Sequence, residues 1–134
     1  MSAFTAAEIA YLRSQFLGRL ATAGRNGQPH VVPVTFRYND SLDAIEIGGL
    51  RFGQTKKFRD MKSNPRVAFV VDDAGPRRGR GIEIRGRAQA LETGGQEIMA
   101  RFSPEMIRIT PRRIVSWGIE GEAFSANARS VRPK

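Results

Sequence analysis

The sequence predicts a mainly β (α+β) fold: about six strands in an antiparallel sheet or small barrel, with short helices at its periphery. Two observations carry this prediction. Asn26-Gly27 stands between two β-prone runs, and this dipeptide is a strong hairpin signal. Residues 43–47 and 82–90 alternate polar and apolar side chains, as half-buried strands do. No G-x-G-x-x-G or Walker sequence is present, so neither standard phosphate loop of a parallel sheet is predicted.

The chain opens with a predicted helix of about three turns. Thr5 and Glu8 have the spacing of a capping box, in which each side chain bonds the other residue's backbone amide. After them Ile9, Leu12 and Phe16 recur at helical spacing. This pattern predicts an amphipathic helix that packs one face on the sheet.

Two strands joined by the Asn26-Gly27 turn follow, over residues 17–23 and 29–38. Pro33 lies inside the second strand and cannot donate a ladder hydrogen bond, which predicts an edge or a bulge there. The later elements are a helix within 55–63, a strand over 66–72, a strand over 82–90, a helix over 96–102 and a strand over 111–119. We expect the polar, basic tail from about residue 127 to fray.

Composition predicts one domain spanning residues 1–134. There is no cysteine, which excludes disulfides, a thiolate nucleophile and thiolate metal sites. His30 is the single histidine, so we predict neither a metal site nor a catalytic triad. No apolar run approaches the roughly 18 residues that span a bilayer, and no secretory signal is recognisable, so we expect a cytoplasmic protein. The net charge of +9 favours an anionic partner.

The segment 53–66 is the strongest candidate for binding that anion. It places Thr55, Lys56, Lys57 and two further cations on one short helix between two strands. A cationic helix start beside a sheet can hold phosphate, although a solvated basic helix has the same composition. Lys57 is our first candidate for the phosphate contact, with Lys56 as the alternative; Thr55 can contact phosphate or simply cap the helix. The arginines at 77, 78 and 80 fit either a solvated loop or a grip on an anionic tail.

Four stretches in this order resemble the flavin-binding split β-barrel family of the pyridoxamine 5′-phosphate oxidase type. They are the hairpin 18–36, the helix and strand 55–68, the strand 82–88, and Pro111-Arg-Arg-Ile-Val-Ser-Trp117. The chain looks closest to the branch that uses the deazaflavin coenzyme F420. One departure is Asp60, where the family has asparagine.

The resemblance implies a six-stranded split barrel that forms a homodimer with two cofactor sites between the protomers. It implies ten cofactor-contacting residues: Pro33, Val34, Thr35, Ile47, Gly48, Gly49, Thr55, Lys56, Lys57 and Trp117. Residues 33–35 would lie against the ring, 47–49 would line the facing strand, and 55–57 would hold the phosphate. Trp117 would come from the partner chain, although a tryptophan there more often belongs to the core. The paired glycines fit this role, because they let backbone approach a flat ligand closely.

These observations favour an F420-dependent oxidoreductase that transfers hydride between the cofactor and a small organic substrate. The cofactor carries the chemistry, so no side chain is predicted to be a catalyst. F420 is preferred to FMN because the net charge of +9 exceeds what one phosphate requires and would also balance the carboxylates of a polyglutamate tail. The alternatives are an FMN-dependent oxidase or reductase of the same fold, and a non-enzymatic barrel that binds a cofactor or nucleic acid. Nucleic acid is not the predicted partner, because no stacking aromatics are interleaved with the cations.

Overall fold

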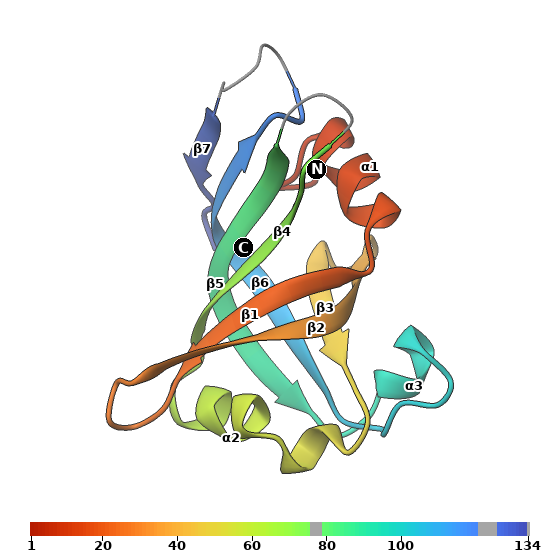
Figure 1. Ribbon diagram of the computed structural model, residues 1–134, viewed down its shortest axis with the longest axis vertical. Coiled ribbons are helices and arrows are strands. Elements are labelled where there is room, and N and C mark those ends of the chain that lie inside the picture. The colour runs from red at the N-terminus through yellow and green to blue at the C-terminus, as the bar shows by residue number, and fades with distance from the viewer. Residues whose placement is uncertain (76–78, 121–125, 134) are drawn as a thin grey trace.

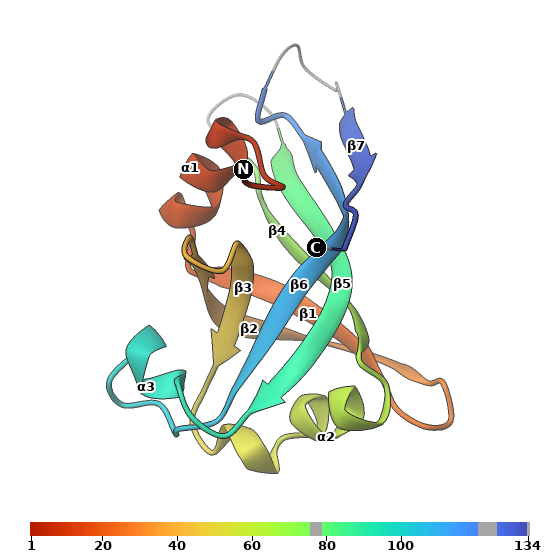
Figure 2. The same ribbon diagram turned by 180° about the vertical axis from the view of Figure 1, so that it is seen from behind.

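The computed structural model describes residues 1–75, 79–120 and 126–133. Its strands form one antiparallel sheet in the order β3-β2-β1-β4-β5-β6-β7, and β3 also pairs with β6 (Figures 1 and 2). This extra pairing closes strands β1 to β6 into a barrel. The strands are β1 (Leu17–Ala23), β2 (Pro29–Asn39), β3 (Ala44–Gly48), β4 (Arg66–Asp73), β5 (Arg80–Leu91), β6 (Met106–Trp117) and β7 (Ala126–Ser130). The predicted six-stranded antiparallel barrel is confirmed, with β7 added along the outside edge of β6.

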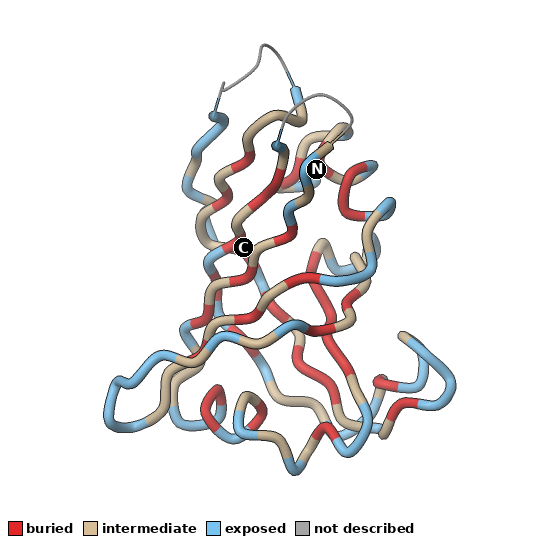
Figure 3. Tube along the Cα trace, in the orientation of Figure 1, coloured by how far each residue is buried: buried red, intermediate tan, exposed pale blue. Residues whose placement is uncertain are grey.

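Buried residues alternate with more exposed ones along the strands (Figure 3). The buried side chains of the core are aliphatic and aromatic. In β5, for example, Ile82 and Ile84 are fully buried while Arg85 and Arg87 are exposed. Pro33 pairs with β1, but β3 begins to pair with β2 only at Thr35. Pro33 therefore has a free edge on one side, as the sequence predicted.

The helices are α1 (Ala6–Ser14), a 3-10 turn η1 (Phe52–Gln54), α2 (Lys56–Ser63) and α3 (Gly95–Ile98). The predicted capping box is present: Thr5 accepts from the Glu8 amide, and Glu8 accepts from the Thr5 amide. The helix ends at Ser14, so the prediction that Phe16 belongs to it is wrong; its side chain is 73% exposed beyond the helix end.

Two predictions for the second half of the chain are also wrong. The helix predicted over 96–102 is the single turn α3, because Met99 is already extended and Ser103 is bonded to the Gly49 carbonyl. The tail does not fray from residue 127: residues 126–130 form β7, paired with residues 113–117 of β6. Arg129 bonds the buried Glu8 carboxylate and the Ala3 carbonyl, which ties this strand to the start of the chain.

Candidate functional site

The start of α2 separates the two lysines that the sequence left as alternatives. Lys56 forms an ion pair with the buried Asp60 one turn further on, at 3.1 Å. Lys57 has no ion pair among the described residues, and its Nζ lies 5.3 Å from the centre of the Phe52 ring. Burial lowers the pKa of Lys57 below its ordinary value. An anion beside Nζ would compensate this desolvation, so Lys57 is the better placed of the two to bind phosphate.

Thr55 serves the helix itself. Its hydroxyl accepts from the Phe58 amide at 3.4 Å and donates to the Phe52 carbonyl at 2.7 Å. These are the contacts of an N-cap, which satisfies an otherwise unpaired amide of the first turn. A phosphate at this helix start would therefore meet the Lys57 ammonium, with the Thr55 hydroxyl already engaged.

Strand β3 is buried along its whole length, whereas β2 exposes alternate residues from Pro29 to Pro33. Val34 and Ile47 point into the barrel core and are 5% and 0% exposed. A ligand outside the barrel can reach these two residues only through their backbone; the contact predicted for residues 33–35 stays a prediction. Pro33 and Thr35 point to the outer face, and Thr35 lies opposite Gly48 in the register. Residues 33–35 and 47–49 are thus brought side by side.

The space beside the paired glycines is filled by the protein's own rings. A Cβ at Gly48 would lie 3.0 Å from Phe102 and 3.2 Å from Ile98, and one at Gly49 would lie 3.3 Å from the Phe52 ring. Ser103 fixes this cover, since its amide and its hydroxyl both donate to the Gly49 carbonyl. The glycines thus admit Phe102 and Phe52, a packing role that sequence reasoning did not foresee.

Trp117 lies far from Lys57, the candidate for the phosphate contact, within one chain. It is the last residue of β6, paired with Gly81 and Ala126. This end of the barrel is opposite to α2 (Figure 1). The structure therefore brings residues 33–35 and 47–49 together and places 55–57 after the η1 turn, but it does not add Trp117 of the same chain to that group.

Next to β3 lies a charge cluster that sequence reasoning missed. Glu46 is fully buried and accepts hydrogen bonds from Arg37, Arg108 and Asn39. Burial by itself raises the pKa of Glu46, but the hydrogen bonds from Arg108 and Arg37 outweigh it and hold the pKa below its ordinary value. Arg37 also binds Glu97 of α3, so this cluster anchors the α3 turn over β3.

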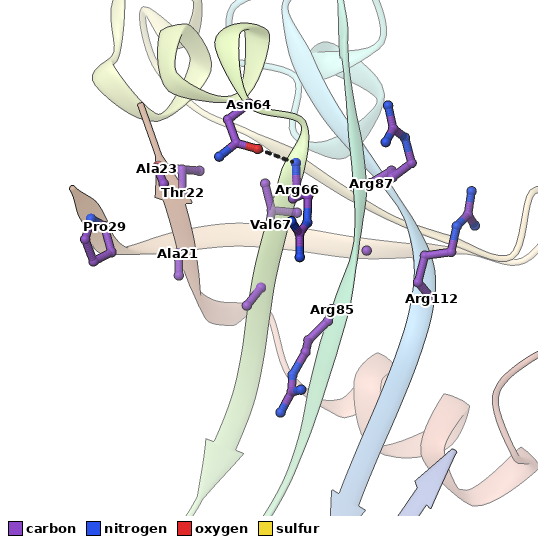
Figure 4. A pocket seen from close by; sticks show the side chains of 12 residues that line it. Ala21, Thr22, Ala23, Pro29, Asn64, Arg66, Val67, Arg85, Arg87 and Arg112 are labelled. Atoms are coloured by element: carbon purple, nitrogen blue, oxygen red, sulfur yellow. Dashed lines mark hydrogen bonds between the residues drawn. The ribbon is translucent and has the colours of Figure 1, made fainter. Parts of the chain in front are cut away.

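A groove of about 520 Å³ on the outer barrel face was also missed (Figure 4). It crosses β1, β4, β5 and β6, and four arginines line it: Arg66, Arg85, Arg87 and Arg112. One sequence signal was available, because Arg85 and Arg87 are two apart on a strand and must share a face. The contribution of β4 and β6 depends on strand register, which the sequence does not display.

The sequence matches the family described as pyridoxamine 5′-phosphate oxidase over residues 4–121. The chain belongs to this family. A curated relative from Streptomyces rimosus, the 5a,11a-dehydrotetracycline/5a,11a-dehydrooxytetracycline reductase, is 53% identical over 132 residues, which is 96% of this chain and 93% of the relative. This relative confirms the expectation of an oxidoreductase that acts on a small organic molecule.

Solved structures confirm the fold. A conserved hypothetical protein of Mycobacterium tuberculosis aligns with a TM-score of 0.67 at 22% identity, covering 92% of this chain and 94% of that one. An FAD-binding protein of Mesorhizobium loti aligns with a TM-score of 0.60 at 24% identity, covering 84% and 93%. Both structures share the split-barrel fold of this chain. Within the described ranges, every helix is too short or too polar to cross a membrane.

Proposed function

We propose that this protein is a reductase that delivers hydride from reduced coenzyme F420 to a double bond of an oxygen-rich polycyclic substrate. The observation that carries the proposal is the 53% identity, over nearly the full length of both chains, to a reductase of dehydrotetracyclines. Reduction of a dehydro compound adds one hydride and one proton across a double bond, and the donor is oxidised by two electrons. When bound, the cofactor supplies the hydride.

The residues at the start of α2 fit the phosphate of such a cofactor. Lys57 presents a partly buried ammonium that no described acid neutralises, and Lys56 is held by Asp60. The backbone of 33–35, with its proline edge, offers a flat outer surface for the ring. FMN carries the same phosphate, so the preference for F420 rests on the net charge of +9 and on the sequence motifs that resemble the F420-dependent branch.

The proposal includes a homodimer. Leu17 and Val31 point outward from the paired strands β1 and β2, and Phe16 precedes them. Their exposed fractions are 44%, 67% and 73%. Phe16 and Leu17 are adjacent, and Val31 pairs with Ala21, four residues further along β1, so a partner surface that spans both positions would bury all three. A second copy on this face would cover them and can bring the partner's Trp117 toward the ring, a contact that one chain does not make.

Titration of the cofactor-free protein with F420 and with FMN, followed by ring fluorescence, tests the cofactor. We expect F420 to bind more tightly, and reduced F420 to be oxidised when a dehydrotetracycline is added. Tighter binding of FMN under all conditions would transfer the proposal to an FMN-dependent enzyme. If the protein binds neither F420 nor FMN, the proposed hydride-transfer activity is contradicted. Sedimentation should give a mass near twice 14.9 kDa; a monomer that binds cofactor would contradict the shared site.

A further inference from the structure

The arginine-lined groove has a floor of unusually small side chains. Ala21 and Ala23 of β1 and Ala68 of β4 line it, and Ala21 lies directly opposite Ala68 in the register. Alanine is depleted in strands, where larger side chains pack better. Three alanines side by side therefore leave a shallow, flat, apolar floor on the outer face of the barrel.

The walls of the groove carry cations that oppose one another. Arg66 of β4 lies directly opposite Arg87 of β5, and Arg85 of β5 lies directly opposite Arg113 of β6. Like charges directly opposite across strands are destabilising. Arg85 is paired with Glu83, but in the part of the chain that the structure describes no acid pairs with Arg66 or Arg87. This arrangement costs folding stability unless an anion lies between them.

A β-bulge adds one more cation. The register between β5 and β6 shifts after Arg85↔Arg113, so that Gly86 faces Pro111 and Arg112 is the extra residue. Gly86 is required here, since a Cβ would lie 2.3 Å from the Thr110 carbonyl oxygen. Bulges re-aim side chains and occur beside functional sites. In this case the bulge adds Arg112 to the lining of the groove, with the other arginines (Figure 4).

We propose that this groove binds a planar, conjugated acid: a fused-ring compound whose ionised enol or phenol oxygens meet the arginines while its ring lies on the alanine floor. Guanidinium groups both stack on flat rings and donate paired hydrogen bonds to oxyanions. A rigid ring loses less conformational entropy on binding than a flexible chain of carboxylates does. The shape of the floor thus favours a planar ligand over an extended polyanion.

The groove continues the face on which the proposed cofactor ring lies. Pro33 pairs with Arg19, and Ala21 is two residues further along β1 on the same side. Two residues of a strand span about 7 Å. The substrate of the proposed reductase can therefore be anchored in the groove with its far end near residues 33–35. This step, which names the substrate class, rests on the proposed function.

The test uses alizarin, a fused-ring phenol, at a pH where it is ionised, with the cofactor-free full-length protein. Arg66→Ala and Arg112→Ala should each weaken its binding about tenfold, the scale of one charge-assisted hydrogen bond. Arg66→Lys should restore only part of the affinity, because it returns the charge without the planar fork. Arg101→Ala, which removes an exposed cation outside the groove, is the matched control and should change little. An equal loss in the control would overturn the proposal.

Two further measurements separate a ligand site from other roles. Ala68→Leu should abolish alizarin binding by filling the floor, while triglutamate should bind weakly to both proteins. Triglutamate that binds more tightly than alizarin would overturn the planar class. Arg66→Ala should not lower the melting temperature, since it relieves repulsion; a marked drop would assign Arg66 to the fold and overturn the proposal.

Titration with F420 distinguishes a failure of the groove proposal from a failure of the proposed function. If the arginine variants bind alizarin more weakly but the protein binds no F420, the groove proposal is supported and the proposed function is contradicted. If F420 binds and alizarin does not, the groove proposal alone is overturned.

Discussion

Two groups of charges on this barrel are built in opposite ways. Glu8 and Glu46 are fully buried, and each carboxylate is surrounded by donors from its own chain. Around the groove, Arg66 and Arg87 face each other with no acid between them among the described residues. The first group serves the fold, because a buried charge is tolerated only with its partners. We expect the opposite of the second group: its facing cations lower stability and keep their hydrogen-bonding capacity for a ligand. On this view the contrast separates structural charges from functional ones.

The largest expected effect is in the buried group. Glu46→Ala removes the acceptor of three donors and leaves two arginines partly buried without their partner. We expect the free energy of unfolding to fall by about 3 kcal/mol, measured by urea denaturation. Glu97→Ala removes the exposed carboxylate bound to the same Arg37 and should cost less than about 0.5 kcal/mol. Similar losses in the two variants would erase the distinction between the groups.

Arg129→Ala tests the other buried carboxylate. It leaves Glu8 with fewer donors and removes the side chain that holds β7 to the start of the chain. We expect a loss of about 2 kcal/mol and faster proteolysis within residues 126–133. Arg113→Ala, which removes a half-buried arginine whose side chain bonds only the Ser130 hydroxyl among described contacts, is the control. If β7 stays protected in Arg129→Ala, its strand pairing alone suffices.

We expect the Lys57 charge at the start of α2 to behave like the groove arginines, so that its removal affects ligand binding and not stability. Lys57→Ala should weaken the cofactor by about 1.5–3 kcal/mol, the value of a hydrogen bond to a charged group, with little change in stability. Lys62→Ala removes a cation from the far end of the same helix, where its Nζ lies 4.9 Å from the Phe58 ring centre. Equal losses of affinity would show that the helix acts only through general charge.

The buried carboxylates also set a pH dependence. The pKa values of Glu8 and Glu46 are lowered in the folded protein from the ordinary 4.5, so their stabilisation is complete above that value. It is lost as the pH falls from about 4.5 through the folded pKa, at about 1.4 kcal/mol per carboxylate and pH unit. Urea denaturation at several pH values should show this slope, and Glu46→Ala should flatten it. An unchanged slope in the variant would place the acid sensitivity elsewhere.

The smallest effect is in the groove. Arg87→Thr removes one of two facing cations and introduces a residue that favours strands, so stability should rise by about 0.5 kcal/mol. Arg101→Thr, outside the groove, should not show this gain. A loss in Arg87→Thr would mean that the arginine supports the fold, and the two groups of charges would no longer differ.

Most of the barrel was predictable because its signals are local. The hairpin turn, the alternating strands and the Thr5–Glu8 capping box are each decided within a few residues. The strand β7 was not, because residues 126–130 lack an apolar alternation and are held by β6 and by Arg129. Arg129 in turn bonds Glu8, which lies 121 positions away in the sequence.

The site divides in the same way. The phosphate site at the start of α2 stays a prediction. The ion pair of Lys56 was available from the sequence, since Lys56 and Asp60 have the i,i+4 spacing of a helical ion pair. The arginine-lined groove could not be predicted from the sequence. Its arginines come from β4, β5 and a bulge in β6, and only the strand register makes neighbours of them.

The bond between Arg129 and Glu8 has a consequence for synthesis of the chain. The two residues are 121 positions apart, so the helix made first receives its last partner only when the final strand has left the ribosome. Until then the Glu8 carboxylate, if α1 docks, would be buried without that arginine, which disfavours docking. We infer that α1 waits undocked on the nascent chain, and that a ribosome-stalled chain lacking the last ten or so residues would leave this helix open to protease.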